Sequence, residues 1–123
     1  MSDPIYLDYQ ATVPMKPAVQ SRMTEVFSQI GNPNSSHSFG RKAAAMLLNA
    51  KDELAQLLHV DPRDIAFTSG STESIEIGLT SVVSRAVMDD PEREWEIITT
   101  PVEHSAVLDT LEWLAAKYST VSV

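Results

Sequence analysis

The chain of 123 residues contains no cysteine. These residues therefore supply no disulfide, no thiolate ligand for zinc or an iron–sulfur cluster, and no cysteine nucleophile. Long apolar runs are also missing, whereas a membrane-spanning helix needs about 20 consecutive apolar residues. The N-terminal stretch MSDPIYLDY has neither the basic region nor the apolar region of a signal peptide. A cytoplasmic location is therefore expected.

Basic residues are scarce, since nine Lys and Arg stand against 17 Asp and Glu and give a formal net charge of −8. A chain this acidic is not expected to bind nucleic acid by neutralising phosphates, or to lie on an anionic membrane. The three histidines form no HxH or HxxxH pair, so no metal site is expected. Apolar residues make up 43% of the chain and charged residues 21%, which is typical of a globular domain.

The spacing of apolar residues predicts an α/β protein. Helices are expected over residues 18–30 and 41–59, from the turn at 69–72 onward, and around 107–118, and strands at 65–67, 95–100 and 120–123. From residue 65 this order is β-α-β-α-β, which indicates a parallel sheet with helical crossovers. The chain ends inside the last predicted strand. We therefore expect the sheet to be incomplete and the native chain to continue.

The stretch FTSGSTES at 67–74 carries the first candidate for chemistry. A predicted strand ends there, Gly70 lets the backbone approach a ligand closely, and a helix begins. The start of a helix offers unpaired backbone N–H groups and a positive dipole end. With the hydroxyls of Ser71 and Thr72 it predicts a site for a phosphate or another anion. The alternative is ordinary N-capping by a serine or threonine side chain.

Two further segments are candidates. Glu103 and His104 follow the strand predicted at 95–100, at the edge of the sheet where α/β folds place their ligands. The imidazole of His104 would stack on a planar ring or move a proton, or it simply caps a helix. The polar segment at 31–40 lacks helical periodicity and is read as a loop, which is either functional or a plain connector.

Four segments occur in one order, namely YLDYQAT at 6–12, GNPNSSH at 31–37, FTSGSTES at 67–74 and EHSAVL at 103–108. Together they resemble the N-terminal portion of the cysteine desulfurases, class V aminotransferase-like enzymes of the pyridoxal 5′-phosphate (PLP) fold type I. The resemblance covers nearly the whole chain. It implies that residues 1–40 are an N-terminal segment with an active-site loop. Residues 41–123 would begin the PLP-binding α/β large domain, with flanking helices.

The resemblance also implies roles for single residues. Ser71 and Thr72 match the turn that holds the PLP phosphate, in agreement with the helix-terminus argument. His104 matches the catalytic histidine that stacks on the pyridine ring and moves protons. A weaker match places five residues near the substrate region, and these are Ala11, Thr12, Asn32, Ser35 and His37.

This sequence departs from the family pattern at two positions, since Val13 stands where a second threonine is usual and Glu76 where an asparagine is usual. In the family, a lysine, an aspartate beside the pyridine nitrogen and a nucleophilic cysteine lie far downstream. None of the four lysines here has the matching Ser-x-His-Lys-like context. PLP binding by these residues is therefore expected to be incomplete, and the chain alone to be inactive.

The function implied by the resemblance is conversion of cysteine to alanine with a persulfide left on the enzyme. The sulfur would pass to an acceptor protein for iron–sulfur cluster assembly or thio-modification, and the full-length enzyme would be a homodimer. Two alternatives remain. One is a non-catalytic fragment that binds phosphate or PLP weakly or dimerises with a full-length relative. The other is a selenocysteine lyase or another class V PLP enzyme. Exposed apolar faces predict poor solubility or oligomerisation of the isolated chain.

Overall fold

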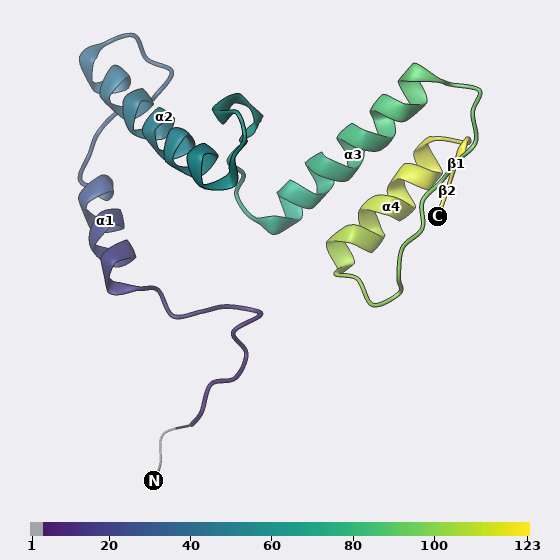
Figure 1. Ribbon diagram of the computed structural model, residues 1–123, viewed down its shortest axis with the longest axis horizontal. Coiled ribbons are helices and arrows are strands. Elements are labelled where there is room, and N and C mark those ends of the chain that lie inside the picture. The colour runs from purple at the N-terminus through teal and green to yellow at the C-terminus, as the bar shows by residue number, and fades with distance from the viewer. Residues whose placement is uncertain (1–3) are drawn as a thin grey trace. The chain divides into compact units, whose positions relative to one another are not determined.

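The computed structural model describes residues 4–123, which form two compact units that divide between Ile65 and Ala66 (Figure 1). Residues 1–3, part of the stretch read above for a signal peptide, lie outside the described residues. The division expected at residue 40 stays a prediction, and it falls inside a helix of the first unit. Among the helices of residues 4–123, none contains an apolar stretch that could span a bilayer.

The first unit contains α1 (Pro17–Phe27), α2 (Ser38–Leu58) and the short 3-10 helix η1 (Pro62–Asp64). Pro17 begins α1, because the first helical position needs no N–H donor and suits the fixed φ of proline. The helix predicted at 18–30 is confirmed, but it ends at Phe27. The start of η1 is capped by Asp61, whose carboxylate accepts from the Arg63 N–H at 2.8 Å.

The second predicted helix is confirmed as α2, which begins three residues earlier than the apolar spacing indicates. His37 explains the difference, because its Nδ1 accepts a hydrogen bond from the Gly40 N–H at 3.3 Å and caps the helix. The helix ends at Leu58, and His59 is its C-cap residue. The φ of His59 is 56°, in the left-handed region, and its N–H donates to the Ala55 carbonyl. A left-handed residue directly after the last turn is a common way for a helix to stop.

The second unit packs α3 (Ser71–Asp89) beside α4 (Ser105–Lys117) (Figure 1). Its core is a small apolar cluster of Val83, Leu111, Leu114 and Val121, in which Leu114 is fully buried. The apolar residues of α3 and of α4 recur at helical spacing, so each helix has one apolar face that packs into this core. A hydrogen bond of 2.9 Å between the Ser84 and Tyr118 hydroxyls also joins α3 to the end of α4.

A two-stranded parallel sheet accompanies these helices. β1 (Trp95–Glu96) pairs with β2 (Val121–Ser122), and the Trp95 and Ile97 N–H groups donate to the carbonyls of Thr120 and Ser122 at 2.8 and 2.9 Å. The predicted parallel β-α-β order is therefore confirmed for β1, α4 and β2. Since only two residues of each predicted strand find partners, both strands are shorter than expected.

The buried strand predicted at 65–67 is wrong. No residue of this segment joins a strand within residues 4–123, and the Phe67 side chain is 51% exposed. A strand exists only where a neighbouring strand completes its hydrogen-bond ladder. Its apolar residues are buried only where something covers both faces. The residues of the segment do not themselves show whether a neighbouring strand or a covering layer is present, which is why the expectation fails here.

The loop at 31–37 folds tightly against the start of α2 within the first unit. The Asn32 side-chain oxygen accepts from the Asn34 N–H at 2.9 Å, and the Asn32 carbonyl accepts from the Ser35 N–H at 2.9 Å. Gly40 is buried against this loop. A Cβ atom at Gly40 would lie 2.7 Å from the Ser35 Cβ and 2.8 Å from the Asn32 carbonyl oxygen.

We expect Gly40→Ala to destabilise the first unit by about 1–3 kcal/mol, because the added methyl group displaces the loop backbone. Gly78→Ala is the matched control, since a Cβ there meets nothing within 4 Å. It should stabilise α3 by up to about 1 kcal/mol through helix propensity. Urea unfolding followed by far-UV circular dichroism measures the first effect. Tryptophan fluorescence measures the second, because Trp95 and Trp113 both lie in the second unit. Equal stability of the Gly40→Ala variant and the parent chain would contradict the packing.

Candidate functional site

The start of α3 carries no side-chain cap. Its N-cap residue is Gly70, in extended conformation, and the first main-chain bond of the helix is donated by the Ser74 N–H to the Gly70 carbonyl at 3.1 Å. The amides of Ser71, Thr72 and Glu73 donate no hydrogen bond to any of residues 4–123. The N-capping alternative is therefore not formed here, since glycine has no side chain to supply the acceptor. The open amides suit an anion.

The side chains of Glu73 and Ser74, in the first turn of α3, contact residues that precede the helix. The Glu73 carboxylate accepts from both the N–H and the hydroxyl of Ser69, at 2.6 and 2.7 Å. These bonds, from the Ser69 side chain first and its backbone second, lower the pKa of Glu73. The Thr68 hydroxyl donates to the Gly70 carbonyl at 3.1 Å and lies 2.6 Å from the Ser74 hydroxyl. Two side chains thus fix the turn at 68–70.

Sequence reasoning named Ser71 and Thr72 in this turn and missed the contribution of Glu73. A signal was available, because a glutamate three residues after an N-cap is typical of a capping box. Here the glutamate accepts from the N–H of Ser69, one residue before the N-cap Gly70. The N-cap position itself, on which this interpretation depends, is known only from the structure.

The start of α4 is capped by His104. Its Nδ1 accepts a hydrogen bond from the Ala106 N–H at 3.1 Å, so in the neutral ring the proton belongs on Nε2. The His104 residue is exposed, and within residues 4–123 its Nε2 takes part in no hydrogen bond. The helix-capping alternative is therefore realised, and it fixes which nitrogen of His104 is available.

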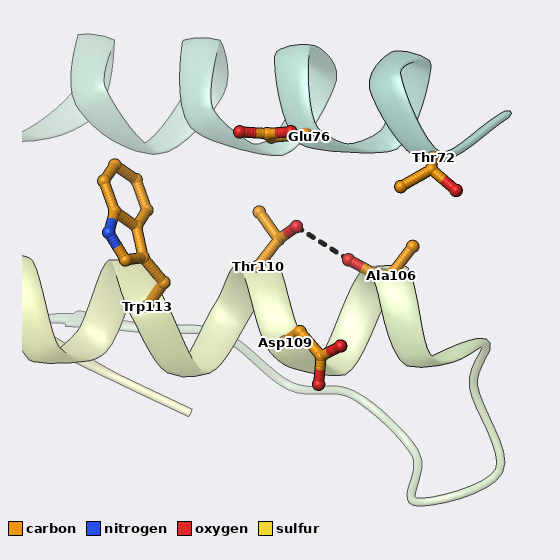
Figure 2. A pocket seen from close by; sticks show the side chains of 6 residues that line it. All are labelled: Thr72, Glu76, Ala106, Asp109, Thr110 and Trp113. Atoms are coloured by element: carbon orange, nitrogen blue, oxygen red, sulfur yellow. Dashed lines mark hydrogen bonds between the residues drawn. The ribbon is translucent and has the colours of Figure 1, made fainter. Parts of the chain in front are cut away.

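The two helix starts lie at the same end of the second unit. Figure 2 shows Thr72 and Ala106 at one end of a pocket between α3 and α4, with Trp113 at the other end. The helices run in the same direction, so their positive dipole ends share one edge, which favours an anion there. The pocket has a volume of about 280 Å³, and its lining is Thr72, Glu76, Ala106, Asp109, Thr110 and Trp113.

The carboxylate of Glu76 lines this pocket one turn after Thr72, as Figure 2 shows. Asp109 of α4 lines it as well. Both positions would repel an anion through the same space in which the helix starts attract one. The departure from the family pattern at Glu76 therefore concerns a side chain beside the candidate anion site.

The remaining sequence candidates belong to the first unit. Asn32, Ser35 and His37 come together in the loop that caps α2. The N–H groups of Ala11 and Thr12 both donate to the Asp8 carbonyl at 3.2 Å. The Tyr6 hydroxyl, which the sequence did not single out, lies 2.8 Å from the Asp8 carbonyl oxygen and 3.0 Å from that of Thr12. Among residues 4–123 no three acidic or histidine side chains gather to hold a metal ion.

We expect His104→Ala to destabilise the second unit by about 1 kcal/mol, because the Ala106 amide loses its acceptor. His104→Asn should stay within about 0.5 kcal/mol of the parent chain, since asparagine is among the best N-cap residues. Urea unfolding monitored by tryptophan fluorescence compares the two variants. An equal loss of stability in both variants would show that the loss does not come from the capping bond to the Ala106 amide.

Comparisons with known proteins identify the family to which the chain belongs. The family model described as aminotransferase class-V matches residues 5–123. Among curated proteins, the chain is 42% identical over 118 residues to "Cysteine desulfurase IscS" of Stutzerimonas stutzeri, a match that covers 93% of this chain and 28% of that protein. It is 43% identical over 118 residues, with the same coverage, to the protein of that name from Ectopseudomonas mendocina.

A solved structure titled "NIFS-LIKE PROTEIN" superposes with a TM-score of 0.80 at 37% sequence identity and covers 96% of this chain and 32% of that chain. The fold is therefore that of the corresponding part of the PLP fold type I, as the resemblance implied. The chain spans about 28% of the length of the curated relatives that it matches. Because the family model covers nearly every residue, the chain belongs to the aminotransferase class-V family, a PLP-dependent family that includes the cysteine desulfurases.

Proposed function

We propose that this chain is the N-terminal part of a PLP-dependent cysteine desulfurase and that its second unit holds the phosphate of the cofactor. Two proteins named cysteine desulfurase are 42% and 43% identical to this chain, in alignments that cover 93% of it. The observation that carries the proposal is the uncapped start of α3. There the amides of Ser71, Thr72 and Glu73 have no partner among residues 4–123.

The donor set at this end fits a phosphate. Three backbone amides and the exposed hydroxyls of Ser71 and Thr72 belong to the first turn of α3, at the positive end of this helix. Gly70 leaves open space beside them, since a Cβ there would meet nothing within 4 Å. Ser71 and Thr72 would bind the phosphate and thereby fix the position of the pyridine ring.

His104 would face the ring of the cofactor from the start of α4. Because Nδ1 is occupied by the Ala106 amide at 3.1 Å, Nε2 is the atom through which His104 donates or moves a proton. The capping bond also orients the imidazole, as stacking on a planar ring requires. In the first unit, Ala11, Thr12, Asn32, Ser35 and His37 would border the substrate.

When bound, PLP acts as an electron sink for the substrate. The lysine that carries the cofactor, the aspartate beside its ring nitrogen and the cysteine that accepts sulfur would come from the remaining part of the protein. The chain covers only 28% of its relatives, so this requirement is consistent with the comparison. Cysteine as substrate, a homodimer, a sulfur-acceptor protein and a cytoplasmic location belong to the same proposal. A selenocysteine lyase would use the same residues of this chain.

One observation favours a second candidate, a chain that keeps phosphate binding without the reaction. Glu76 places a carboxylate in the pocket beside Thr72, where the family usually has an asparagine. Negative charge near the phosphate weakens phosphate binding and disfavours any further negative charge that develops beside it. Such a chain would still fold as a member of the family and bind phosphate through its backbone.

The phosphate site is tested with pyridoxamine 5′-phosphate, which lacks the aldehyde that reacts with surface lysines. We expect saturable binding by the chain, and a loss of about tenfold or more in affinity for the Ser71→Ala/Thr72→Val double variant, which loses two hydroxyl donors to a charged group. Isothermal titration measures the affinity, with pyridoxamine as the control ligand that lacks the phosphate. Equal binding of both ligands would rule out a phosphate site at α3.

The desulfurase function is tested in a chimera in which this chain replaces the matching 118 residues of the Stutzerimonas stutzeri relative. We expect the chimera to form alanine and, with a thiol reductant, sulfide from cysteine. Cofactor binding without alanine formation would favour the non-catalytic candidate. Recovery of alanine formation by Glu76→Asn in the same chimera would then assign the defect to this carboxylate.

A further inference from the structure

Ser69, next to the uncapped start of α3, is able to compete with a phosphate for the amides of the first turn. Serine is among the best N-capping residues, and Ser69 lies one residue before the N-cap Gly70. If α3 began one residue earlier, Ser69 would be the N-cap and its hydroxyl would accept from the amides of Ser71 or Thr72 that the proposed phosphate needs. The structure shows that this hydroxyl is instead engaged by Glu73.

The bonds from Glu73 hold the whole of Ser69. Both the main-chain N–H and the side-chain hydroxyl of Ser69 donate to the same carboxylate oxygen, at 2.6 and 2.7 Å. Hydrogen bonds to a charged acceptor are stronger than neutral ones. Ser74 makes the parallel contact to Thr68, at 2.6 Å between hydroxyl oxygens. Both residues before Gly70 are thereby kept off the amides of the first turn.

We propose that Glu73 is a positioning residue for the phosphate site, which holds Ser69 back and so keeps the amides of Ser71 and Thr72 open to an anion. This inference rests on the proposed function. Glu73 touches no ligand in this account, because its carboxylate is already bonded to Ser69. It acts through the conformation of the turn.

A purely electrostatic role for Glu73 makes the opposite prediction. A carboxylate in the first turn of α3 repels a phosphate, so removing its charge would tighten anion binding whatever residue replaces it. Positioning depends instead on the length and the acceptor atoms of the side chain. Glu73→Asp keeps the charge and shortens the reach to Ser69, whereas Glu73→Gln removes the charge and keeps an acceptor at the same reach. These two variants separate the explanations.

Titration with pyridoxamine 5′-phosphate, followed by NMR of the Ser71 and Thr72 amides, measures the effect in the full chain. We expect Glu73→Ala and Glu73→Asp to weaken binding about threefold to tenfold, as for the loss of a charge-assisted hydrogen bond at an exposed site. Glu73→Gln should bind within about twofold of the parent chain or more tightly. Glu112→Ala, an equal change of charge on an exposed residue of α4, should leave binding unchanged.

Amide hydrogen exchange at Ser69 provides a readout that needs no ligand. It should become faster in Glu73→Ala and Glu73→Asp and remain slow in Glu73→Gln. Tighter or equal binding by Glu73→Ala and Glu73→Asp, or unchanged exchange at Ser69, would overturn the positioning role and leave the phosphate site intact. Failure of the parent chain to bind the probe would overturn the phosphate site itself, and the role of Glu73 with it.

Discussion

The absence of a side chain at Gly70 is the constraint on which the candidate site depends. A helix start needs acceptors for its first amides, and most sequences supply one from a serine, threonine, asparagine or aspartate at the N-cap. Here the N-cap is a glycine, and the side chains around it bond to the turn and not to the helix amides. The donors at Ser71, Thr72 and Glu73 are therefore left for something outside residues 4–123.

The first amides of α4, in contrast to those of α3, have a side-chain acceptor at the N-cap. His104 satisfies the Ala106 amide with its own Nδ1, so this helix needs no external anion. In the first unit, His37 caps α2 with the same atom. A histidine that caps a helix through Nδ1 keeps its Nε2 free of that bond, so Nε2 can still exchange a proton. The two helix starts of the second unit thus divide the tasks expected of them, since one offers amides and the other presents an oriented imidazole.

Local patterns in the sequence predict much of this arrangement, and their limits are physical. Helical periodicity locates the long helices of residues 4–123, because each needs an apolar face along its own length. It places the start of α2 too late, because a histidine cap carries no apolar signal. The strand expected at 65–67 is read from the flanking residues, since the segment is too short for periodicity, and it finds no ladder partner because pairing depends on residues elsewhere. The order of glycine and hydroxyl residues predicts the candidate anion site at Ser71 and Thr72, whereas the bond from Glu73 to Ser69 depends on side-chain geometry that the sequence does not show.

The donors at the start of α3 belong mainly to the main chain, and this has a consequence for how such a chain changes over evolutionary time. Side-chain hydroxyls at Ser71 and Thr72 disappear with single substitutions, but the amides of the same residues persist under every substitution except proline. Binding encoded in the backbone is thus more durable than chemistry encoded in side chains. A lineage that loses its reaction would keep these open amides for as long as the helix start and its glycine remain.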